Sequence, residues 1–271
     1  MTFLEIYGVV ALVILGYMTL IWILSLILKN SSIVDIFWGA GFVVANWVYF
    51  ALTPEGFATR KWLLNALVTI WGSRLSIYIL IRNWGQPEDY RYRKWREDAG
   101  SKWWWYSYFK VFLLQGFLMW IISTPLLAVQ INPTPDVLTV VDYIAVVVWG
   151  IGFFFEAVGD WQLRRFKSKP ENEGKVLNSG VWRYTRHPNY FGDATQWWGY
   201  YLLAAAAGGW WTIFSPIIMT FFLLRVSGVA MLEKNLRETK PKYKEYIETT
   251  SAFVPWFPKE KEEDEETEED G

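Results

Sequence analysis

Long apolar stretches alternate with short polar loops along most of the chain. A helix needs about 20 apolar residues to cross the hydrocarbon of a bilayer, and seven stretches approach or reach that length. They lie at residues 6–28, 33–52, 62–81, 109–131, 137–158, 191–208 and 210–231. Gly208 and Gly209 suit a tight turn between the last two, since glycine tolerates positive φ. The pattern predicts an all-α, polytopic membrane bundle of about seven transmembrane helices.

Composition supports a membrane protein and excludes several kinds of site. Hydrophobic residues make up 53% of the 271 residues and charged residues 20%, against roughly 25% charged in soluble domains. The absence of cysteine excludes disulfides, thiolate metal sites and iron–sulfur clusters. With His187 as the single histidine we expect no metal, so redox chemistry would need an organic cofactor. The net charge of −1 gives no sign of a nucleic-acid partner, and we expect none.

Basic residues gather in three regions, at 82–102, 164–186 and 234–244. With seven spans these regions share one side, and the opposite side keeps only Arg60 and Lys61. The positive-inside rule then places the N-terminus outside and the C-terminus in the cytoplasm. The first apolar stretch is too long and continuous for a cleaved signal peptide, so we expect it to be retained.

One transmembrane domain is predicted over residues 1–258, because no internal repeat and no soluble second domain is visible. The last thirteen residues, KEKEEDEETEEDG at 259–271, contain no apolar side chain. Such a run of like charge is typical of a disordered, solvated tail.

Polar residues collect where the fifth stretch enters its loop. Glu156, Asp160 and Arg164 are spaced by four and share one face of a helix. An exposed helix-end salt bridge explains that spacing equally well. However, Glu156 lies within or next to an apolar span, where a carboxylate is costly and usually functional. The basic residues that follow suit either anionic lipid headgroups or the phosphates of a nucleotide.

The segment GVWRYTRHPNYFGD, residues 180–193, is the most polar point between two apolar runs. Pro188 is predicted to begin a helix whose free N–H groups and positive dipole end suit a phosphate. Arg183 and Arg186 add positive charge beside it. Snorkelling arginines at a membrane surface explain these two residues, but not Asn189 and Asp193, which lie on one face of the next span.

Isolated charges also occur inside other apolar runs. Arg225 is followed eight residues later by Glu233, on a similar helical face. Arg74 and Tyr78 are four apart in the third stretch. An arginine inside a membrane span is costly and usually indicates a functional site. Asp35 opens the second stretch, where a helix-dipole partner is the simpler interpretation.

Four segments together resemble the steroid 5-alpha-reductase-like family, in its bacterial branch of uncharacterised membrane proteins. They are GDWQLRRF, GVWRYTRHPNYFGD, LLRVSGVAMLE and YKEYIETTSAFVPWFP. SIVDIFWG and DYRYRKWRE are typical of the same branch, so the similarity covers nearly the whole chain. Isoprenylcysteine carboxyl methyltransferases, which are related along with sterol reductases, carry a similar RHP-x-Y-x-G and a similar ending.

The resemblance implies a membrane reductase that binds NADPH in its cytoplasmic C-terminal half, about residues 150–258, in a bacterial inner membrane. Carried over by position, the cofactor contacts are Asp160, Arg164, Leu177, Trp182, His187, Asn189, Tyr190, Asp193, Glu233, Tyr243 and Tyr246. Arg74 and Tyr78 match positions that line the nicotinamide side. The charge pattern adds Arg186 and Arg225 to the predicted cofactor-binding set.

One position departs from the family pattern. The steroid enzymes place a catalytic tyrosine three residues before the arginine that matches Arg74, and here that residue is Trp71, which has no phenolic proton. Asp35 and Tyr78 are therefore our candidate catalytic residues. We expect NADPH-dependent reduction of a carbon–carbon double bond in a lipophilic, steroid- or isoprenoid-like substrate.

Two alternatives stay open at this point. One is S-adenosylmethionine-dependent methyl transfer in the membrane, as in the methyltransferase relatives. The other is a non-catalytic protein that binds lipid or sterol, for which Trp71 in place of tyrosine is the supporting feature.

Overall fold

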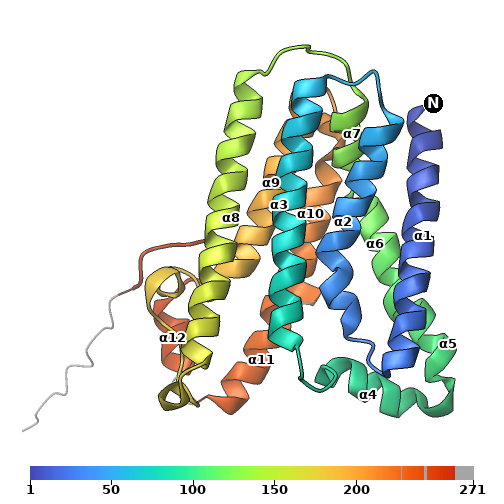
Figure 1. The fold of residues 1–271 in the computed structure, drawn as a ribbon. Helices are drawn as coiled ribbons and strands as arrows, with labels where there is room; N and C mark the ends of the chain where they lie inside the picture. The colour runs from blue at the N-terminus through green and yellow to red at the C-terminus, as the bar shows by residue number, and fades with distance from the viewer. Residues whose placement is uncertain (227, 241–242, 260–271) are drawn as a thin grey trace, which may run out of the picture. The chain divides into compact units, whose positions relative to one another are not determined.

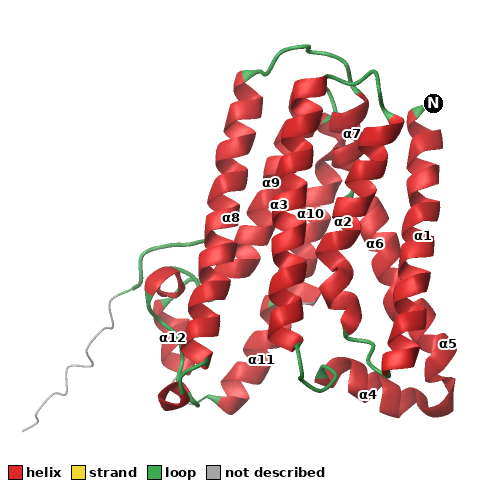
Figure 2. Ribbon diagram, in the orientation of Figure 1, coloured by secondary structure: helices red, strands yellow, loops and turns green. Residues whose placement is uncertain are grey.

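The computed structural model describes residues 1–226, 228–240 and 243–259, and within these ranges the chain forms helices and loops without a strand (Figures 1 and 2). The predicted all-α fold is therefore confirmed for the described residues. The predicted acidic tail falls, apart from Lys259, outside them and stays a prediction.

Five helical runs in the described part of the chain are long and apolar enough to cross a membrane. They are α1 (Phe3–Leu28), α2 (Ile33–Leu52), α3 (Ala58–Asn83), the run Tyr90–Ile131, and α8 (Val140–Lys167). These confirm five of the seven predicted stretches. The sixth stretch falls on α9 (Pro188–Ala206), whose first half is polar, and the seventh begins with a shorter apolar run, Trp210–Val226. The chain is a helical membrane protein, and a crossing by these last two segments stays a prediction.

Contacts divide the chain into two compact units. The first contains Met1–Val147 and Trp198–Ile218, and the second contains Val148–Trp197 and Met219–Gly271. The boundary falls inside α8, α9 and α10 (Phe214–Phe221), so each of these helices contributes residues to both units. Every predicted cofactor contact except Arg74 belongs to the second unit, whereas Asp35, Arg74 and Tyr78 belong to the first.

The first unit is built on α1, α2 and α3 with the helical run after them. That run consists of α4 (Tyr90–Ala99), η1 (Gly100–Lys102), α5 (Trp103–Ser107), the π-helix η2 (Tyr108–Leu113), α6 (Leu114–Ile122) and α7 (Thr124–Ile131). The helices α2 and α3 approach closely because Gly39 faces Gly72, where an added Cβ would lie 2.5 Å from the opposite carbonyl oxygen. The short helix η5 (Trp210–Ile213) follows Gly208, whose φ of 81° confirms the predicted glycine turn.

Arg60 and Lys61, which we counted as loop cations, are buried at the start of α3. The Arg60 guanidinium pairs with Asp142 at 2.7 Å and also donates to the carbonyls of Pro135 and Val137. The Lys61 ammonium donates to backbone carbonyls at the C-terminal end of α2. These cations therefore fix loops and helix ends within the first unit, and the orientation of the chain in the membrane stays a prediction.

The second unit is organised around a close contact between α8 and α9. A Cβ added at Gly192 would lie 2.5 Å from the Gly152 carbonyl oxygen and 2.4 Å from the Glu156 amide nitrogen. The two backbones can touch only because both positions lack a side chain. This contact sets the polar half of α9 against the carboxylates of α8. The unit is completed by η3 (Pro170–Asn172), η4 (Gly180–Arg183), α11 (Val229–Thr239) and α12 (Tyr243–Thr249).

The predicted helix over 210–231 is interrupted. Beyond α10 (Phe214–Phe221) the chain turns into a π-helix, η6 (Phe222–Val226), and α11 begins only after Gly228. A Cβ at Gly228 would lie 2.0 Å from the Leu223 carbonyl oxygen, so the chain folds tightly there. Arg225 is exposed whereas Glu233 is buried, and our prediction that they share a helical face is wrong, because the break changes the phase of the helix.

Candidate functional site

A buried ion cluster lies at the centre of the second unit. The Arg186 guanidinium contacts the Glu233 carboxylate through Nε and Nη2, both at 2.8 Å. His187 Nε2 lies 3.2 Å from the same carboxylate oxygen, Glu233 Oε1. A carboxylate can only accept hydrogen bonds, so this contact places the imidazole proton on Nε2. All three side chains are buried, so the Arg186 and Glu233 charges depend on each other for their stability.

The same arginine ties this cluster to α12. Arg186 Nη1 donates to the backbone carbonyls of Ile247 and Thr250, at the C-terminal end of α12, where a helix leaves carbonyls without partners. The Tyr246 hydroxyl donates to the carbonyl of Trp182, and the Trp182 indole in turn donates to the Gly159 carbonyl at 3.0 Å. These bonds join α8, the loop before α9, and α12.

Two further polar pairs join α8 to α9. Asn189 Nδ2 donates to Asp160 at 3.1 Å, and Gln196 Nε2 donates to Glu156 at 2.6 Å. Asp193 is buried one turn of α9 beyond Asn189. The Gln196 Oε1 atom is buried and receives no hydrogen bond from the described residues. Because a buried acceptor without a partner is costly, this atom marks a place where a donor from outside the chain would be favourable.

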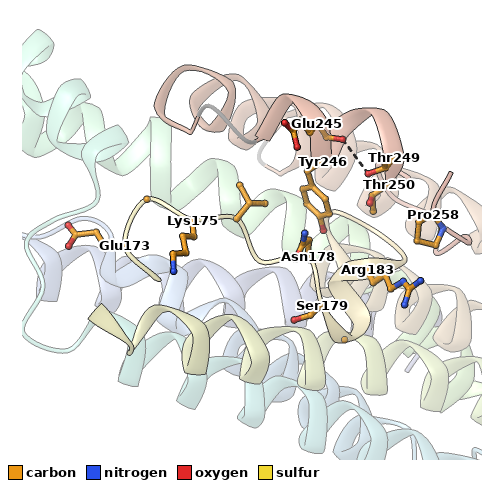
Figure 3. A pocket seen from close by; sticks show the side chains of 13 residues that line it. Glu173, Lys175, Asn178, Ser179, Arg183, Glu245, Tyr246, Thr249, Thr250 and Pro258 are labelled. Carbon is orange, nitrogen blue, oxygen red and sulfur yellow. Dashed lines mark hydrogen bonds between the residues drawn. The ribbon is translucent and has the colours of Figure 1, made fainter. Parts of the chain in front are cut away.

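A groove of about 1040 Å³ opens beside the ion cluster, between the 173–183 segment and α12. Figure 3 shows its charged side chains, two cations and two carboxylates, which are Lys175, Arg183, Glu173 and Glu245. Asn178, Ser179 and Thr249 add groups that donate or accept hydrogen bonds. Tyr246 and Thr250 belong both to the groove wall and to the network around Arg186.

The structure brings together most of the residues predicted for the second unit. Tyr190 stacks on His187 with ring centroids 5.7 Å apart, and Tyr243 is buried beside Tyr246 at 5.9 Å. Leu177 is half-buried in the loop that leads into the groove. Arg164 and Arg225 are exposed, whereas the ion cluster is formed by the buried Arg186, His187 and Glu233.

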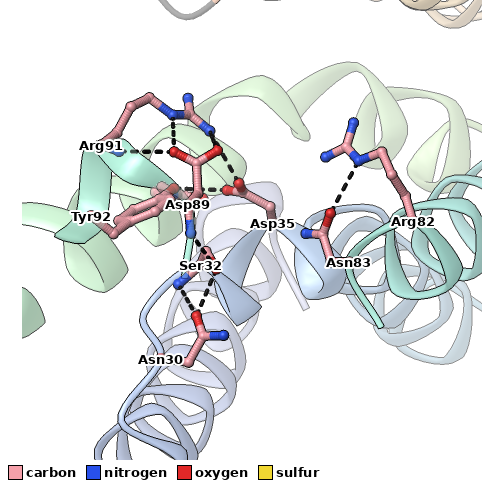
Figure 4. A network of polar contacts seen from close by, with 9 residues as sticks. Asn30, Ser32, Asp35, Arg82, Asn83, Asp89, Arg91 and Tyr92 are labelled. Atoms are coloured by element: carbon pink, nitrogen blue, oxygen red, sulfur yellow. Dashed lines mark hydrogen bonds and ion pairs between the residues drawn. The ribbon is translucent and has the colours of Figure 1, made fainter. Parts of the chain in front are cut away.

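The candidates in the first unit form two separate groups. The Arg74 guanidinium lies 5.4 Å from the centroid of the Tyr78 ring, as their spacing predicts. Asp35 belongs to the other group. Its carboxylate accepts a hydrogen bond from the Tyr92 hydroxyl at 2.7 Å and lies 3.4 Å from Arg91, as Figure 4 shows.

Sequence reasoning missed Tyr92 as a partner of Asp35. Tyr92 is the one buried residue of α4, whose other residues are mostly charged. Its hydroxyl also lies within 3.4 Å of Gln115 Nε2. A tyrosine on a mostly charged helix indicates a buried contact, but the sequence does not show its partner, because Asp35 is 57 residues away. Glu245 of the groove was also missed, whereas Lys175 falls within the basic region 164–186 that was considered for phosphates.

The stability of the second unit should depend on acid pH through Glu233. Burial alone would raise the pKa of this carboxyl, but the hydrogen bond from His187 and the Arg186 charge outweigh burial and lower the pKa from 4.5 to about 2. The unfolded chain therefore takes up a proton at higher pH than the folded one. The stabilisation is complete above pH 4.5 and is lost as the pH falls toward 2, amounting to about 3 kcal/mol.

Unfolding in detergent, followed from pH 6 to pH 3 by circular dichroism, measures this dependence. We expect wild type and Glu233→Gln to differ most above about pH 4.5 and to converge below it. Two curves that stay parallel across this range would show that Glu233 titrates normally in the folded protein.

Comparisons with known proteins give one match. A family model described as "Protein of unknown function (DUF1295)" matches residues 21–250. Searches of curated proteins and of solved structures each find no match. The matched range includes the Asp35–Tyr92 pair and the whole buried ion cluster.

Proposed function

The chain belongs to the DUF1295 family, and from that premise we propose that it is a membrane-embedded, NADPH-dependent reductase of a carbon–carbon double bond in a lipophilic substrate. This family is grouped with the steroid 5-alpha-reductases and the isoprenylcysteine carboxyl methyltransferases. Membership supports a membrane enzyme with a site in its C-terminal half, and the reductase activity and the cofactor are our proposal.

The observation that supports this proposal most directly is that the ion cluster and the groove lie next to each other and share residues. Tyr246 and Thr250 are shared by both, so the groove opens directly against the buried network of Arg186. A volume of about 1040 Å³ is at the upper end of the roughly 300–1,000 Å³ typical of cofactor sites.

The residues present fit a dinucleotide phosphate. Lys175 and Arg183 would hold phosphate groups, because guanidinium and ammonium groups bind them by charge-assisted hydrogen bonds. Glu173 and Glu245 would accept hydrogen bonds from ribose hydroxyls. The unsatisfied Gln196 Oε1 supports a bound donor deeper in the unit. When bound, NADPH supplies a hydride.

The proton in such a reduction would come from the chain itself. Asp35 and Tyr92 form a carboxyl–phenol pair that can hold and pass a proton. Trp71 cannot do so, because its indole has no acidic group. Tyr78 lies beside Arg74 and is the second candidate phenol. Tyr92→Phe should therefore keep NADPH binding and lose NADPH-dependent reduction in membranes, whereas loss of binding would assign Tyr92 a structural role.

Thermal-shift titration of the purified protein with NADPH and with S-adenosylmethionine tests the cofactor. We expect stabilisation by NADPH and none by S-adenosylmethionine. Arg183→Gln should weaken NADPH binding about tenfold, as expected for one charge-assisted contact to phosphate. Arg183 is exposed, so the fold should be unaffected.

The matched control is Arg165→Gln, which removes an exposed cation of the same unit outside the groove. This variant should bind NADPH as wild type does. Stabilisation by S-adenosylmethionine alone would favour methyl transfer, and no response to either ligand at millimolar concentration would favour a non-catalytic lipid-binding protein.

A further inference from the structure

The segment after α12, residues 251–258, is an irregular stretch held firmly by hydrogen bonds; we call it the strap. Its Ser251 carbonyl accepts from the Arg186 amide at 2.9 Å, and its Trp256 amide donates to the Tyr184 carbonyl at 2.9 Å. The Thr185 hydroxyl donates to the Phe253 carbonyl at 2.8 Å. The strap is thus fixed to the residues that lead into the ion cluster.

Three large apolar side chains of the strap are mostly exposed, although the Phe257 ring also contacts Tyr184, with centroids 6.0 Å apart. Their exposed fractions are 59% for Val254, 71% for Trp256 and 76% for Phe257. Exposing such side chains to water is unfavourable in proportion to their apolar area, by about 25 cal/mol per Å². Several exposed apolar side chains on one short, hydrogen-bonded segment indicate a contact with lipid or with another protein.

The position of the strap along α8 favours lipid. Phe253 packs on Phe191 with centroids 5.9 Å apart, and Phe191 packs on Phe155 of α8 at 5.2 Å. Further along α8, Trp161 is exposed and the Arg165 guanidinium lies 5.5 Å from the centroid of its ring. An exposed Trp–Arg pair at the end of an apolar span is typical of the headgroup level.

The spacing along the helix then gives the depth of the strap. Trp161 lies six residues beyond Phe155, which at 1.5 Å per residue is about 9 Å further toward the polar end of α8. Phe155, where the ring contacts that lead to Phe253 begin, therefore lies on the apolar side of the Trp161–Arg165 pair.

The backbone of the strap suits such a place. Irregular backbone in lipid is costly because its N–H and C=O groups lose water. Pro255 and Pro258 have no N–H group, and the Ser251 and Phe253 carbonyls and the Trp256 amide already have partners. Fewer groups of the strap therefore need water than in an ordinary loop of this length.

We propose that the strap is a membrane-contact element, which seats Val254, Trp256 and Phe257 in the bilayer interface and so holds residues 184–186 in place beside the ion cluster. This assignment does not depend on the reductase proposal, because it rests on exposure, ring contacts and backbone bonds alone.

The absence of cysteine from the chain allows a direct test. A nitroxide label is attached to Val254→Cys, Trp256→Cys or Phe257→Cys, each reconstituted in vesicles of phosphatidylethanolamine and phosphatidylglycerol. Oxygen concentrates in lipid and a nickel chelate stays in water, so their relative relaxation of the label reports its surroundings. Glu173→Cys and Asn178→Cys in the open groove are the aqueous controls.

We expect the ratio of oxygen to nickel accessibility at the three strap positions to exceed the ratio at the groove positions several-fold. Strap labels with the same ratio as the groove labels would place the strap in water and overturn the proposal. Labels that are inaccessible to both reagents would show coverage by protein, and would overturn it equally.

Discussion

Replacing Glu233 with glutamine should lower the free energy of unfolding by about 3–5 kcal/mol at neutral pH, the cost of removing one partner of a buried ion pair. The loss is large because the Arg186 guanidinium stays buried without a counter-charge, and because the His187 Nε2 proton loses a charged acceptor. Arg186 also holds the C-terminal end of α12, so the destabilisation should spread to that helix.

Denaturant unfolding of the purified protein in detergent measures this effect. The matched control is Glu245→Gln, which removes an exposed carboxylate of α12 and should change stability by less than about 0.5 kcal/mol. Equal, small effects for the two variants would mean that the cluster around Arg186 is not buried as a charged unit.

Replacing Gly192 with alanine should be nearly as damaging, by about 3 kcal/mol, the upper part of the range for overpacking. The added methyl would meet the backbone of α8 at Gly152 and Glu156, and backbone atoms cannot move aside as a flexible side chain can. The two helices would separate, and the Asn189–Asp160 and Gln196–Glu156 hydrogen bonds would lengthen.

Gly150→Ala is the control for this substitution. Gly150 lies on the partner helix α8, two residues before Gly152, and an added Cβ there would meet nothing within 4 Å. Alanine is favoured over glycine inside a helix by roughly 0.5–1 kcal/mol, so this variant should be unchanged or slightly more stable. A Gly192→Ala protein that unfolds at the same denaturant concentration as Gly150→Ala would show that α8 and α9 do not touch here.

Local sequence patterns were enough to predict the helical spans and part of the site. Hydropathy predicts five runs that the structure confirms, and Pro188 correctly marks the first residue of α9. The spacing of Glu156 and Asp160 predicts that they share one helix face, and in the structure both accept hydrogen bonds from α9. These features depend on residues within a few turns of one another, which is the range in which sequence periodicity is informative.

Features that depend on distant pairing could not be predicted in this way. Arg60 is buried because Asp142 lies against it, 82 residues later, and no local pattern contains that partner. The break before α11 depends on a π-turn and on the tight fold at Gly228. The groove exists only because α12 packs against the loop before α9, so its lining residues come from two separate stretches.

Mass analysis of retained nucleotide tests the central claim most directly, namely that the cluster and groove of the second unit hold a dinucleotide. Wild type and Arg183→Gln are incubated with equal concentrations of NADPH and S-adenosylmethionine, freed of unbound ligand, and denatured to release what remains. We predict NADPH in stoichiometric amount from wild type and markedly less from Arg183→Gln. Release of S-adenosylmethionine, or of neither compound, from the folded wild-type protein would contradict the claim.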